Sequence, residues 1–512
     1  MKSNLRVLCS ALIVVVASFQ LSVATVNAKI SFDKPAPVWM RVTPPAPKFS
    51  DSERQSELAK RRANVAAKMG EKSLMILFSG EPRIYSNDVD YVFRQENNLY
   101  YLTMLRQKGA ILVLMPDNAE TPEILFLPKR NAFDETWTGK MYSQDDARKI
   151  SGVKTVYDID KFEGFLASVK AKKPFQNITG EKLFAAANES KANLFLLLPT
   201  TKDVREFRRE KAFADELNLE KTGYNVKNAQ YLFGELRLIK SPMEIAIMQH
   251  AIDITGEGFG RAMSVAAKSK FEYEVQSEIE YTFRRRNADY WGYPSIVGCG
   301  ENATTLHYEH PQGAINDGDL ILMDVGAEYD HYTADITRTF PINGKFTREQ
   351  AEIYQIVYDA QDALAKAIKP GATIQEMNAA ATEVLKDGLF KLGLITDKTS
   401  SQHRIWTKHG TTHWLGMNVH DVGAGNARFK AGMIFTNEPG IYIRADTLDN
   451  LEKTPENEKF IAAIKPAFEK YKNIGVRIED DMLVTNDGAI WLTKNIPRKI
   501  ADVEAMILES RK

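Results

Sequence analysis

An apolar strand that ends in a carboxylate constrains this chain more than any other feature. The run Leu320-Ile-Leu-Met-Asp324 is apolar up to its last residue, and Asp335 follows it. If the chain turns near Tyr329-Asp330, the two carboxylates lie roughly opposite each other on a strand pair. Buried like charges destabilise a sheet unless a proton, a basic partner or a cation neutralises them. A shared metal ion and an ion pair with Arg338 both meet this need, and both stay open at this point.

Three further candidate ligands favour the metal. They occur as His413 in His409-Gly-Thr-Thr-His413, Glu438 in Asn-Glu438-Pro-Gly and Glu479 in Arg-Ile-Glu479-Asp. The residues between His409 and His413 are poor helix formers, which argues against a helical zinc pair. One histidine with four carboxylates is a hard, oxygen-rich set that suits manganese or a similar divalent ion.

These residues, in this order, resemble the ligand set of the pita-bread metallopeptidases, the family of methionine aminopeptidase, prolidase and aminopeptidase P. The flanking residues that carry the resemblance are Asp324-Val-Gly, Thr333-Ala-Asp335-Ile-Thr-Arg-Thr-Phe-Pro341, Glu438-Pro-Gly and Arg477-Ile-Glu479-Asp480. The resemblance covers about residues 50–505, and its amino-terminal half rests on weaker phrases, Asn98-Leu-Tyr-Tyr-Leu102 and Phe133-Asp-Glu-Thr-Trp-Thr-Gly139. It implies an α/β (α+β) fold with an amino-terminal creatinase/aminopeptidase-P-type α/β domain and a carboxy-terminal pita-bread catalytic domain.

The resemblance also implies an activity. A separate amino-terminal domain argues against methionine aminopeptidase, and the intact ligands argue against creatinase. The segment His409-Gly-Thr-Thr-His413-Trp-Leu-Gly is more similar to aminopeptidase P than to prolidase. We therefore expect an aminopeptidase that releases the first residue from peptides with proline at position two. The alternatives are an Xaa-Pro dipeptidase, another two-metal hydrolase and a non-catalytic binding protein.

Site roles follow from the resemblance as well. It implies two divalent ions, with Mn²⁺ expected, bridged by Asp335 and Glu479, while His413 and Glu438 complete one site and Asp324 the other. The expected nucleophile is a hydroxide between the ions, because each cation lowers the pKa of bound water. The residues expected to act on substrate and protons are Glu438, His307 and His420. Those expected to orient the ligands are Tyr442, Arg477 and His409.

Four segments divide the chain. Residues 1–28, with Lys2 and Arg6 before a short apolar run and small residues up to Ala28, predict a secretory signal peptide and export to a periplasm or the exterior. Residues 29–49 are proline-rich and predict a linker. Residues 50–235 form the expected amino-terminal α/β domain, and residues 236–512 the catalytic domain. The apolar run within residues 1–28 is too short for a stable membrane anchor.

Periodicity and capping signals predict the main elements. The expected helices are 50–69, 162–172, 243–266, 273–286, 348–368 and 373–392. The expected strands are 74–78, 99–102, 110–115, 124–127, 194–198, 320–326, 333–340, 433–443 and 475–485. The order of helices and strands in the second half suggests two similar α/β halves, and the charged segment Asp446–Lys472 predicts a surface helical excursion beside the site.

Composition limits the partners. With 67 basic and 67 acidic residues the chain has no net charge, which argues against nucleic acid. Cys9 falls in the expected leader, so Cys299 is left without a disulfide partner and is expected to be a buried thiol. The expected partner is a peptide with proline at position two, and the resemblance implies homo-oligomeric assembly.

Overall fold

The computed structural model describes residues 42–201, 206–217 and 219–511. The predicted signal peptide, residues 1–28, lies outside these residues, as do residues 29–41 of the predicted linker, which spans 29–49. Within the rest of that linker, Thr43 is buried. Its backbone N–H and its hydroxyl both donate to Glu257 Oε2, at 2.7 and 2.6 Å, so residue 43 is fastened to the second half of the chain.

The amino-terminal half is built on one mixed sheet of six strands. In spatial order they are β6 (Thr155–Asp158), β5 (Glu123–Leu127), β4 (Ile111–Leu114), β1 (Ser73–Phe78), β7 (Ala192–Leu196) and β8 (Tyr224–Asn228). β4 pairs antiparallel with both β1 and β5, whereas β6, β7 and β8 join in parallel. Smaller elements outside the sheet are β2 (Ile84–Ser86), β3 (Val89–Asp90) and α3 (Ala132–Thr138).

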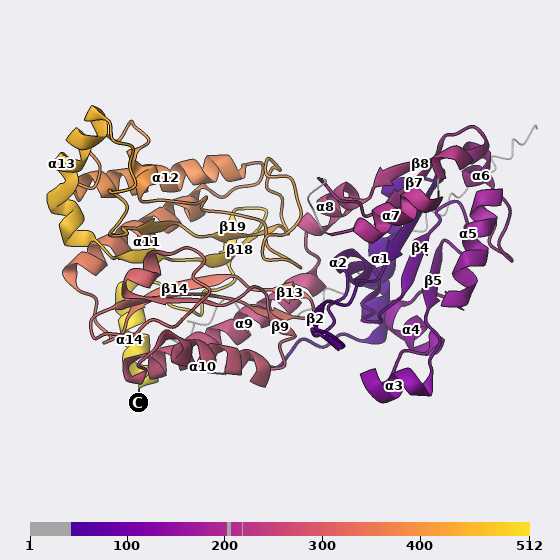
Figure 1. Ribbon diagram of the computed structural model, residues 1–512, viewed down its shortest axis with the longest axis horizontal. Helices are drawn as coiled ribbons and strands as arrows, with labels where there is room; N and C mark the ends of the chain where they lie inside the picture. The colour runs from indigo at the N-terminus through magenta and orange to yellow at the C-terminus, as the bar shows by residue number, and fades with distance from the viewer. Residues whose placement is uncertain (1–41, 202–205, 218, 512) are drawn as a thin grey trace, which may run out of the picture. The chain divides into compact units, whose positions relative to one another are not determined.

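Side chains alternate between the two faces of this sheet, as the pleat requires. Met75 and Leu77 of β1 face one core cluster, and Leu74 and Ile76 face another. The helices over the first face are α1 (Asp51–Met69), α2 (Asn97–Thr103), α4 (Gln144–Ser151) and α8 (Gln230–Leu238). Those over the second are α5 (Phe162–Ala171), α6 (Glu181–Asn188) and α7 (Arg208–Leu217). Figure 1 shows α1 and α2 on one side of the strands and α5 and α6 on the other.

One predicted strand is wrong. Residues 99–102 form the middle of helix α2, where every residue from Asn98 to Thr103 is buried. An apolar run that is buried on all sides has no periodicity to separate helix from strand. The deciding contact is local: the Glu96 carboxylate accepts the Leu99 N–H at 2.7 Å and caps the helix.

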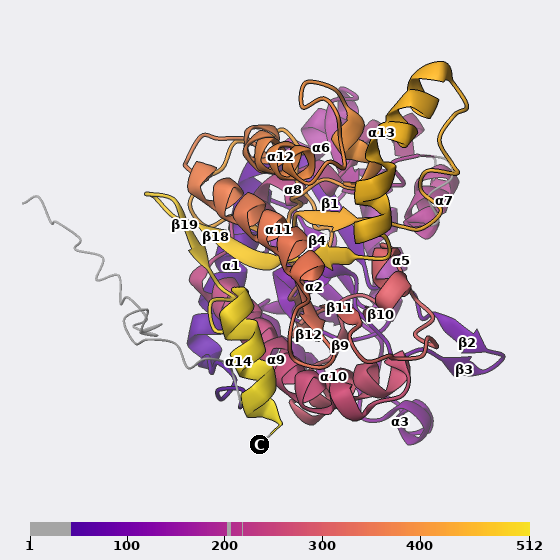
Figure 2. The same ribbon diagram turned by 90° about the vertical axis from the view of Figure 1, so that its left-hand side faces the viewer.

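The second half repeats one pattern, a helix pair followed by a three-stranded antiparallel sheet. The first set is α9 (Pro242–Val265), α10 (Glu272–Arg285) and the sheet of β10 (Ile296–Cys299), β11 (Leu320–Val325) and β14 (Ile336–Pro341). The second is α11 (Arg348–Ala367), α12 (Ile374–Lys391) and the sheet of β15 (Ile434–Asn437), β18 (Asp480–Val484) and β19 (Ala489–Trp491). The strands lie between the two helix pairs (Figures 1 and 2), and the two predicted α/β halves thus have the same order of elements.

Short strands connect these sheets. They are β9 (Tyr290–Trp291), β12 (Ala327–Tyr329), β13 (Tyr332–Thr333), β16 (Gly440–Tyr442) and β17 (Gly475–Arg477). Each of three long predicted strands is therefore broken in two, because 333–340, 433–443 and 475–485 contain a gap at Asp335, at Glu438 and at Glu479 respectively. The breaks coincide with predicted ligands.

The charged segment Asp446–Lys472 contains α13 (Pro455–Tyr471), as the predicted helical excursion requires. Its apolar face is buried in the core of the second half through Phe460, Ile464 and Phe468. The chain ends in α14 (Ile500–Ser510), which packs against α9. Among the described helices, none combines the length and apolar character needed to cross a membrane.

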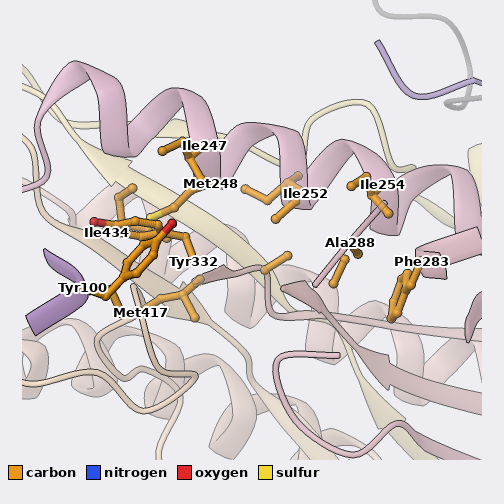
Figure 3. Close-up of a cluster of buried hydrophobic side chains, with 14 of the residues drawn as sticks. Tyr100, Ile247, Met248, Ile252, Ile254, Phe283, Ala288, Tyr332, Met417 and Ile434 are labelled. Carbon is orange, nitrogen blue, oxygen red and sulfur yellow. The ribbon is translucent and has the colours of Figure 1, made fainter. Parts of the chain in front are cut away.

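A single apolar cluster joins the two halves under α9. Ile247, Met248 and Ile252 of α9 point into it, and Tyr100 of α2 reaches it beside Tyr332 (Figure 3). Polar contacts reinforce this junction, since Arg94 pairs with Glu328 and Arg237 with Asp421. The strands that carry the carboxylates are therefore held by packing from both halves.

Candidate metal centre

Three predicted ligands converge within the second half. The ligand atoms of Asp335, His413 and Glu479 all lie within 4.8 Å of one another. His413 Nε2 is 3.3 Å from Asp335 Oδ2 and 3.2 Å from Glu438 Oε1, which brings in the fourth ligand. The side chains are largely enclosed, with Asp335 and Glu479 only 3% and 2% exposed.

The fifth, Asp324, is joined to this group through a tyrosine. The Tyr293 hydroxyl lies 2.6 Å from Asp324 Oδ1 and 2.6 Å from Asp335 Oδ1. A hydroxyl has one proton, so it satisfies one of these acceptors at a time. Asp324 is paired directly with Thr337 in the register, and Asp335 comes two residues before Thr337. The two carboxylates are thus close neighbours, offset by two residues from the direct pairing, in agreement with the prediction that they lie roughly opposite each other.

The breaks between strands free three carboxylates from the regular ladder while keeping their backbones bonded. The N–H of Glu438 donates to Thr411 O at 3.0 Å, and that of Glu479 donates to Thr337 O at 3.1 Å. The N–H of Asp335 donates to the Asp481 carboxylate at 3.2 Å. Each ligand is therefore anchored by its own main chain, which limits its motion toward or away from the centre.

The electrostatics of the carboxylates fit a cation. Burial raises the pKa of Asp335 to about 6, with the Asp324 charge acting in the same direction and His413 opposing it. Burial raises the pKa of Glu479 well above its usual range, and the charges of Asp335 and Glu438 add to this. A divalent ion among these oxygen atoms offsets both the burial and the mutual repulsion. One imidazole and four carboxylates are also ligands that such an ion commonly binds in proteins.

In contrast to Asp335 and Glu479, the pKa values of Glu438 and His413 shift in the direction that favours the charged form. Burial raises the pKa of Glu438, but the hydrogen bond from His409 and the charge of His413 lower it by more. Burial lowers the pKa of His413, but Asp335 and Glu438 raise it to about 9. Because a histidine must be neutral to bind a metal, a cation and a proton compete for His413 Nε2.

The residues predicted to orient the ligands form one connected network. Arg477 donates to Asp324 Oδ2 at 2.5 Å and to the Tyr442 hydroxyl at 2.7 Å. His409 contacts that hydroxyl through Nε2 at 2.7 Å, and its Nδ1 lies 3.2 Å from Glu438 Oε2. All of these groups are connected to a ligand, either directly or through one hydroxyl.

Arg338 does not neutralise the paired aspartates. It is fully buried and binds Asp480 at 2.5 Å, together with the carbonyls of Pro497, Ile496 and Glu479. The ion-pair alternative raised by the sequence thus applies to Asp480 instead of Asp324 or Asp335. This leaves Arg477 as the cation that contacts the cluster.

The two other histidines lie at the edge of the centre. His420 is exposed, and its ring lies 4.5 Å from that of His413 at an angle of 87°. Partial burial and the neighbouring His413 charge lower the pKa of His420. His307 is exposed on the loop after β10, and within the described part of the chain no hydrogen bond or ion pair joins it to the ligands. The structure therefore brings His420 to the cluster and leaves His307 facing solvent.

Three contributors were not predicted. Tyr293 bridges two ligands, Thr337 donates to Glu479 Oε2 at 2.6 Å, and Asp481 accepts from the Asp335 backbone. Asp481 is fully buried, and its Oδ1 has no partner among the described residues. Spacing does not reveal Tyr293, which comes from a loop far from the ligand segments. The run of acidic residues from Glu479 to Asp481 was a usable signal for the last.

Comparison with known proteins agrees with this arrangement. Residues 246–486 match Metallopeptidase family M24, and residues 58–178 match the aminopeptidase P amino-terminal domain. The Xaa-Pro aminopeptidase of Haemophilus influenzae is 34% identical over 462 residues, covering 88% of this chain and 97% of that protein. The Xaa-Pro aminopeptidase of Escherichia coli is 33% identical, covering 91% of this chain and all of that protein.

Solved structures agree as well. Aminopeptidase P from E. coli superposes with a TM-score of 0.77 at 30% identity, covering 91% of this chain and 100% of that one. Aminopeptidase PepP from Pseudomonas aeruginosa gives 0.75 at 32%, with coverages of 89% and 98%. The predicted two-domain fold with a pita-bread catalytic domain is confirmed. The chain is a hydrolase of metallopeptidase family M24 that carries the aminopeptidase P amino-terminal domain.

Proposed function

We propose that this protein is an Xaa-Pro aminopeptidase, which releases the first residue of a peptide whose second residue is proline. The observation that carries the proposal is the convergence of Asp335, His413 and Glu479 in a chain that is similar, over most of its length, to proteins of that name. The same relatives disfavour the prolidase alternative. An intact set of five ligands disfavours a non-catalytic binding protein.

The ligands are proposed to hold two divalent ions, with manganese as the native metal. Asp335 and Glu479 would bind both ions, His413 and Glu438 one of them, and Asp324 the other. Bound divalent ions lower the pKa of a water molecule toward neutrality and so supply a nucleophile without a serine or cysteine. Arg477 and Tyr293 keep Asp324 in place through the hydrogen bonds described above.

Glu438 is proposed as the proton acceptor of the reaction. Its lowered pKa keeps it ionised at neutral pH, and His409 at 3.2 Å and the Thr436 hydroxyl at 3.3 Å orient its two oxygens. A carboxylate held in this way takes the proton from the attacking water and passes it to the leaving amine.

His307 and His420 are proposed to hydrogen-bond the substrate and the developing oxyanion. Both are exposed to solvent, as a group that meets an incoming peptide must be. The scissile Xaa-Pro amide has no N–H, so it cannot be held through a donor, and the site must hold the substrate by its carbonyl and its ring.

A matched peptide set tests the function. Manganese-loaded protein is given Ala-Pro, Ala-Pro-Pro and Ala-Ala-Ala, with Glu438→Gln alongside, and released alanine is measured. Cleavage of Ala-Pro-Pro at its first bond, lost in the variant, supports the proposal. Activity on Ala-Pro alone would indicate a dipeptidase, and no cleavage of any peptide would rule out both.

Export and assembly are separate proposals. The leader-like composition of residues 1–28 supports export, and cell fractionation that finds full-length protein only in the cytoplasm would contradict it. Homo-oligomeric assembly is proposed from the family resemblance, and sedimentation equilibrium of the purified chain at micromolar concentration would show a monomer if it is wrong.

A further inference from the structure

A cavity of about 320 Å³ lies beside the candidate centre, in a part of the chain to which no role has been assigned so far. Its lining residues are Lys408, Arg444, Asp446, Thr447, Asn450 and Leu451. Lys408 also lines a second hollow of about 340 Å³, which includes His409 of the centre. The two hollows therefore adjoin, and one opens onto a residue that contacts Glu438.

The walls of the cavity come from the segments that carry the centre. Lys408 directly precedes His409, and Arg444 comes two residues after Tyr442. The Arg444 guanidinium donates to the Thr305 hydroxyl at 3.3 Å, and Thr305 is two residues before His307. The lining of the cavity is therefore continuous in sequence with residues of the centre, and through Thr305 it contacts the segment that carries His307, a candidate substrate contact.

The cavity contains one cation, Lys408, that has no direct ion-pair partner in the described part of the chain. Arg444 is held by a two-point ion pair with Asp446, at 3.0 and 2.9 Å, so these two charges cancel. Lys408 is exposed and has no hydrogen bond or ion pair with any residue in the described part of the chain. Burial and the Arg444 charge lower the pKa of Lys408, and the Asp446 charge opposes them only in part. An anion beside the ammonium group would relieve this unfavourable environment.

The sign of this charge decides which end of a peptide the cavity meets. The amino terminus of an aminopeptidase substrate is cationic, so Lys408 would repel it. The departing part of the peptide ends in a carboxylate, which Lys408 attracts. Thr447, Asn450 and Leu451 come from the segment before α13, so the charged excursion forms one wall.

We propose that this cavity is a carboxylate subsite for the departing part of the substrate, with Lys408 as its cation and Arg444 and Asp446 as its rigid wall. The inference rests on the proposed aminopeptidase function and deepens it, because it makes the enzyme selective for peptides that present a carboxylate shortly after proline. That carboxylate is the carboxy terminus of a short peptide or an acidic side chain in a longer one.

The test compares Ala-Pro-Gly with its carboxy-terminal amide, which lacks only the negative charge, and with the longer peptide Ala-Pro-Gly-Asp, whose end is amidated and whose carboxylate is a side chain. Each is given to manganese-loaded wild-type protein, Lys408→Met and Lys408→Arg. Lys459→Met is the matched control, because it removes one exposed lysine from α13 that does not line the cavity. KM and kcat are measured separately, at low and high salt.

We expect Lys408→Met to raise KM for Ala-Pro-Gly about 3–10-fold with kcat unchanged, the range of a partly exposed ion pair. Lys408→Met should leave the amide unaffected, Lys408→Arg and Lys459→Met should behave as wild type, and high salt should raise KM only for substrates that carry a carboxylate. A Lys408 effect on the aspartate peptide would extend the subsite to acidic side chains. Equal effects on acid and amide, or no effect of Lys408→Met, would overturn the subsite. Failure of wild type to cleave even the amide would instead overturn the proposed function.

Discussion

The two halves of this protein bury their strands by different means. In the amino-terminal sheet, β1 and β4 consist of apolar residues apart from Ser73, all are buried except the partly buried Phe78, and no charged side chain enters these strands. In the second half, β11, β14 and β18 are equally buried but include Asp324, Arg338, Asp480 and Asp481. Burial is therefore similar, whereas its chemistry is not.

The difference separates a part of the molecule that contributes mainly stability from a part that contributes mainly function. An apolar strand is stabilised by about 25 cal/mol for each Å² removed from water. A buried carboxylate loses its hydration and is tolerated only when hydrogen bonds, an opposite charge or a metal replace it. The first sheet therefore serves as a scaffold. The strands of the second half contain buried charged residues, and binding of a cation explains why those residues are there.

The largest expected effect comes from removing one ligand charge. Asp335→Asn should lower kcat/KM by about 10³-fold or more, because a metal ligand is lost. In chelator, its unfolding free energy should equal or exceed that of wild type, since one buried repulsive charge has gone. Urea denaturation and peptide kinetics check both points. If Asp335→Asn in chelator were several kcal/mol less stable than wild type, the proposed difference between the two halves would be wrong.

The converse substitution belongs in the first sheet. Leu112 is fully buried in β4, so Leu112→Ala should lower the unfolding free energy by about 2–5 kcal/mol. The kcat of the folded fraction should stay at the wild-type value, because no ligand contacts this strand. Denaturation midpoints and kinetics at low temperature measure this. A specific loss of kcat would show that the two halves are not separable in this way.

A smaller effect is expected at the hydroxyl between two ligands. Tyr293→Phe should reduce manganese affinity or kcat/KM about 10–100-fold, the usual range for a residue that orients a metal ligand. Tyr354→Phe is the matched control, because its buried hydroxyl donates to Arg498 O at 2.8 Å, away from the centre. Metal titration followed by calorimetry separates the two variants, and equal losses would mean that the position of the hydroxyl does not matter.

The smallest effect concerns a buried acid outside the centre. Burial raises the pKa of Asp253 to about 6, against which the hydrogen bond from Gln249 acts weakly. Because the folded state holds its proton more tightly, this group favours folding below its unfolded pKa near 4 and loses that contribution as pH rises through about 6. Asp253→Asn should therefore be more stable than wild type at pH 7, by about 1–2 kcal/mol, and equal at pH 4. Thermal melts at both pH values measure it, and a difference that is independent of pH would contradict the assignment.

Most regular elements could be predicted, because their signals are local. The Ser50–Glu53 capping box begins α1, and Pro242 occupies the first position of α9 inside a Ser241–Glu244 capping box. The helix at residues 99–102 also had a local signal, the Glu96 cap, which the apolar run concealed. The breaks at Asp335, Glu438 and Glu479 had none, because they depend on hydrogen bonds to groups far away in the sequence.

The sequence by itself indicated the five candidate ligands, because buried carboxylates need a cation or its equivalent and because the order and flanking residues of the set resemble those of one family. It also determined that the chain has two α/β parts. Only the tertiary structure decided which positive side chain faces the cluster, since Arg477 and Arg338 lie on neighbouring strands and differ only in what surrounds them. Tyr293 and the Lys408 cavity were likewise decided by tertiary structure, because they are made by segments far apart in the chain, and no local pattern encodes such a meeting.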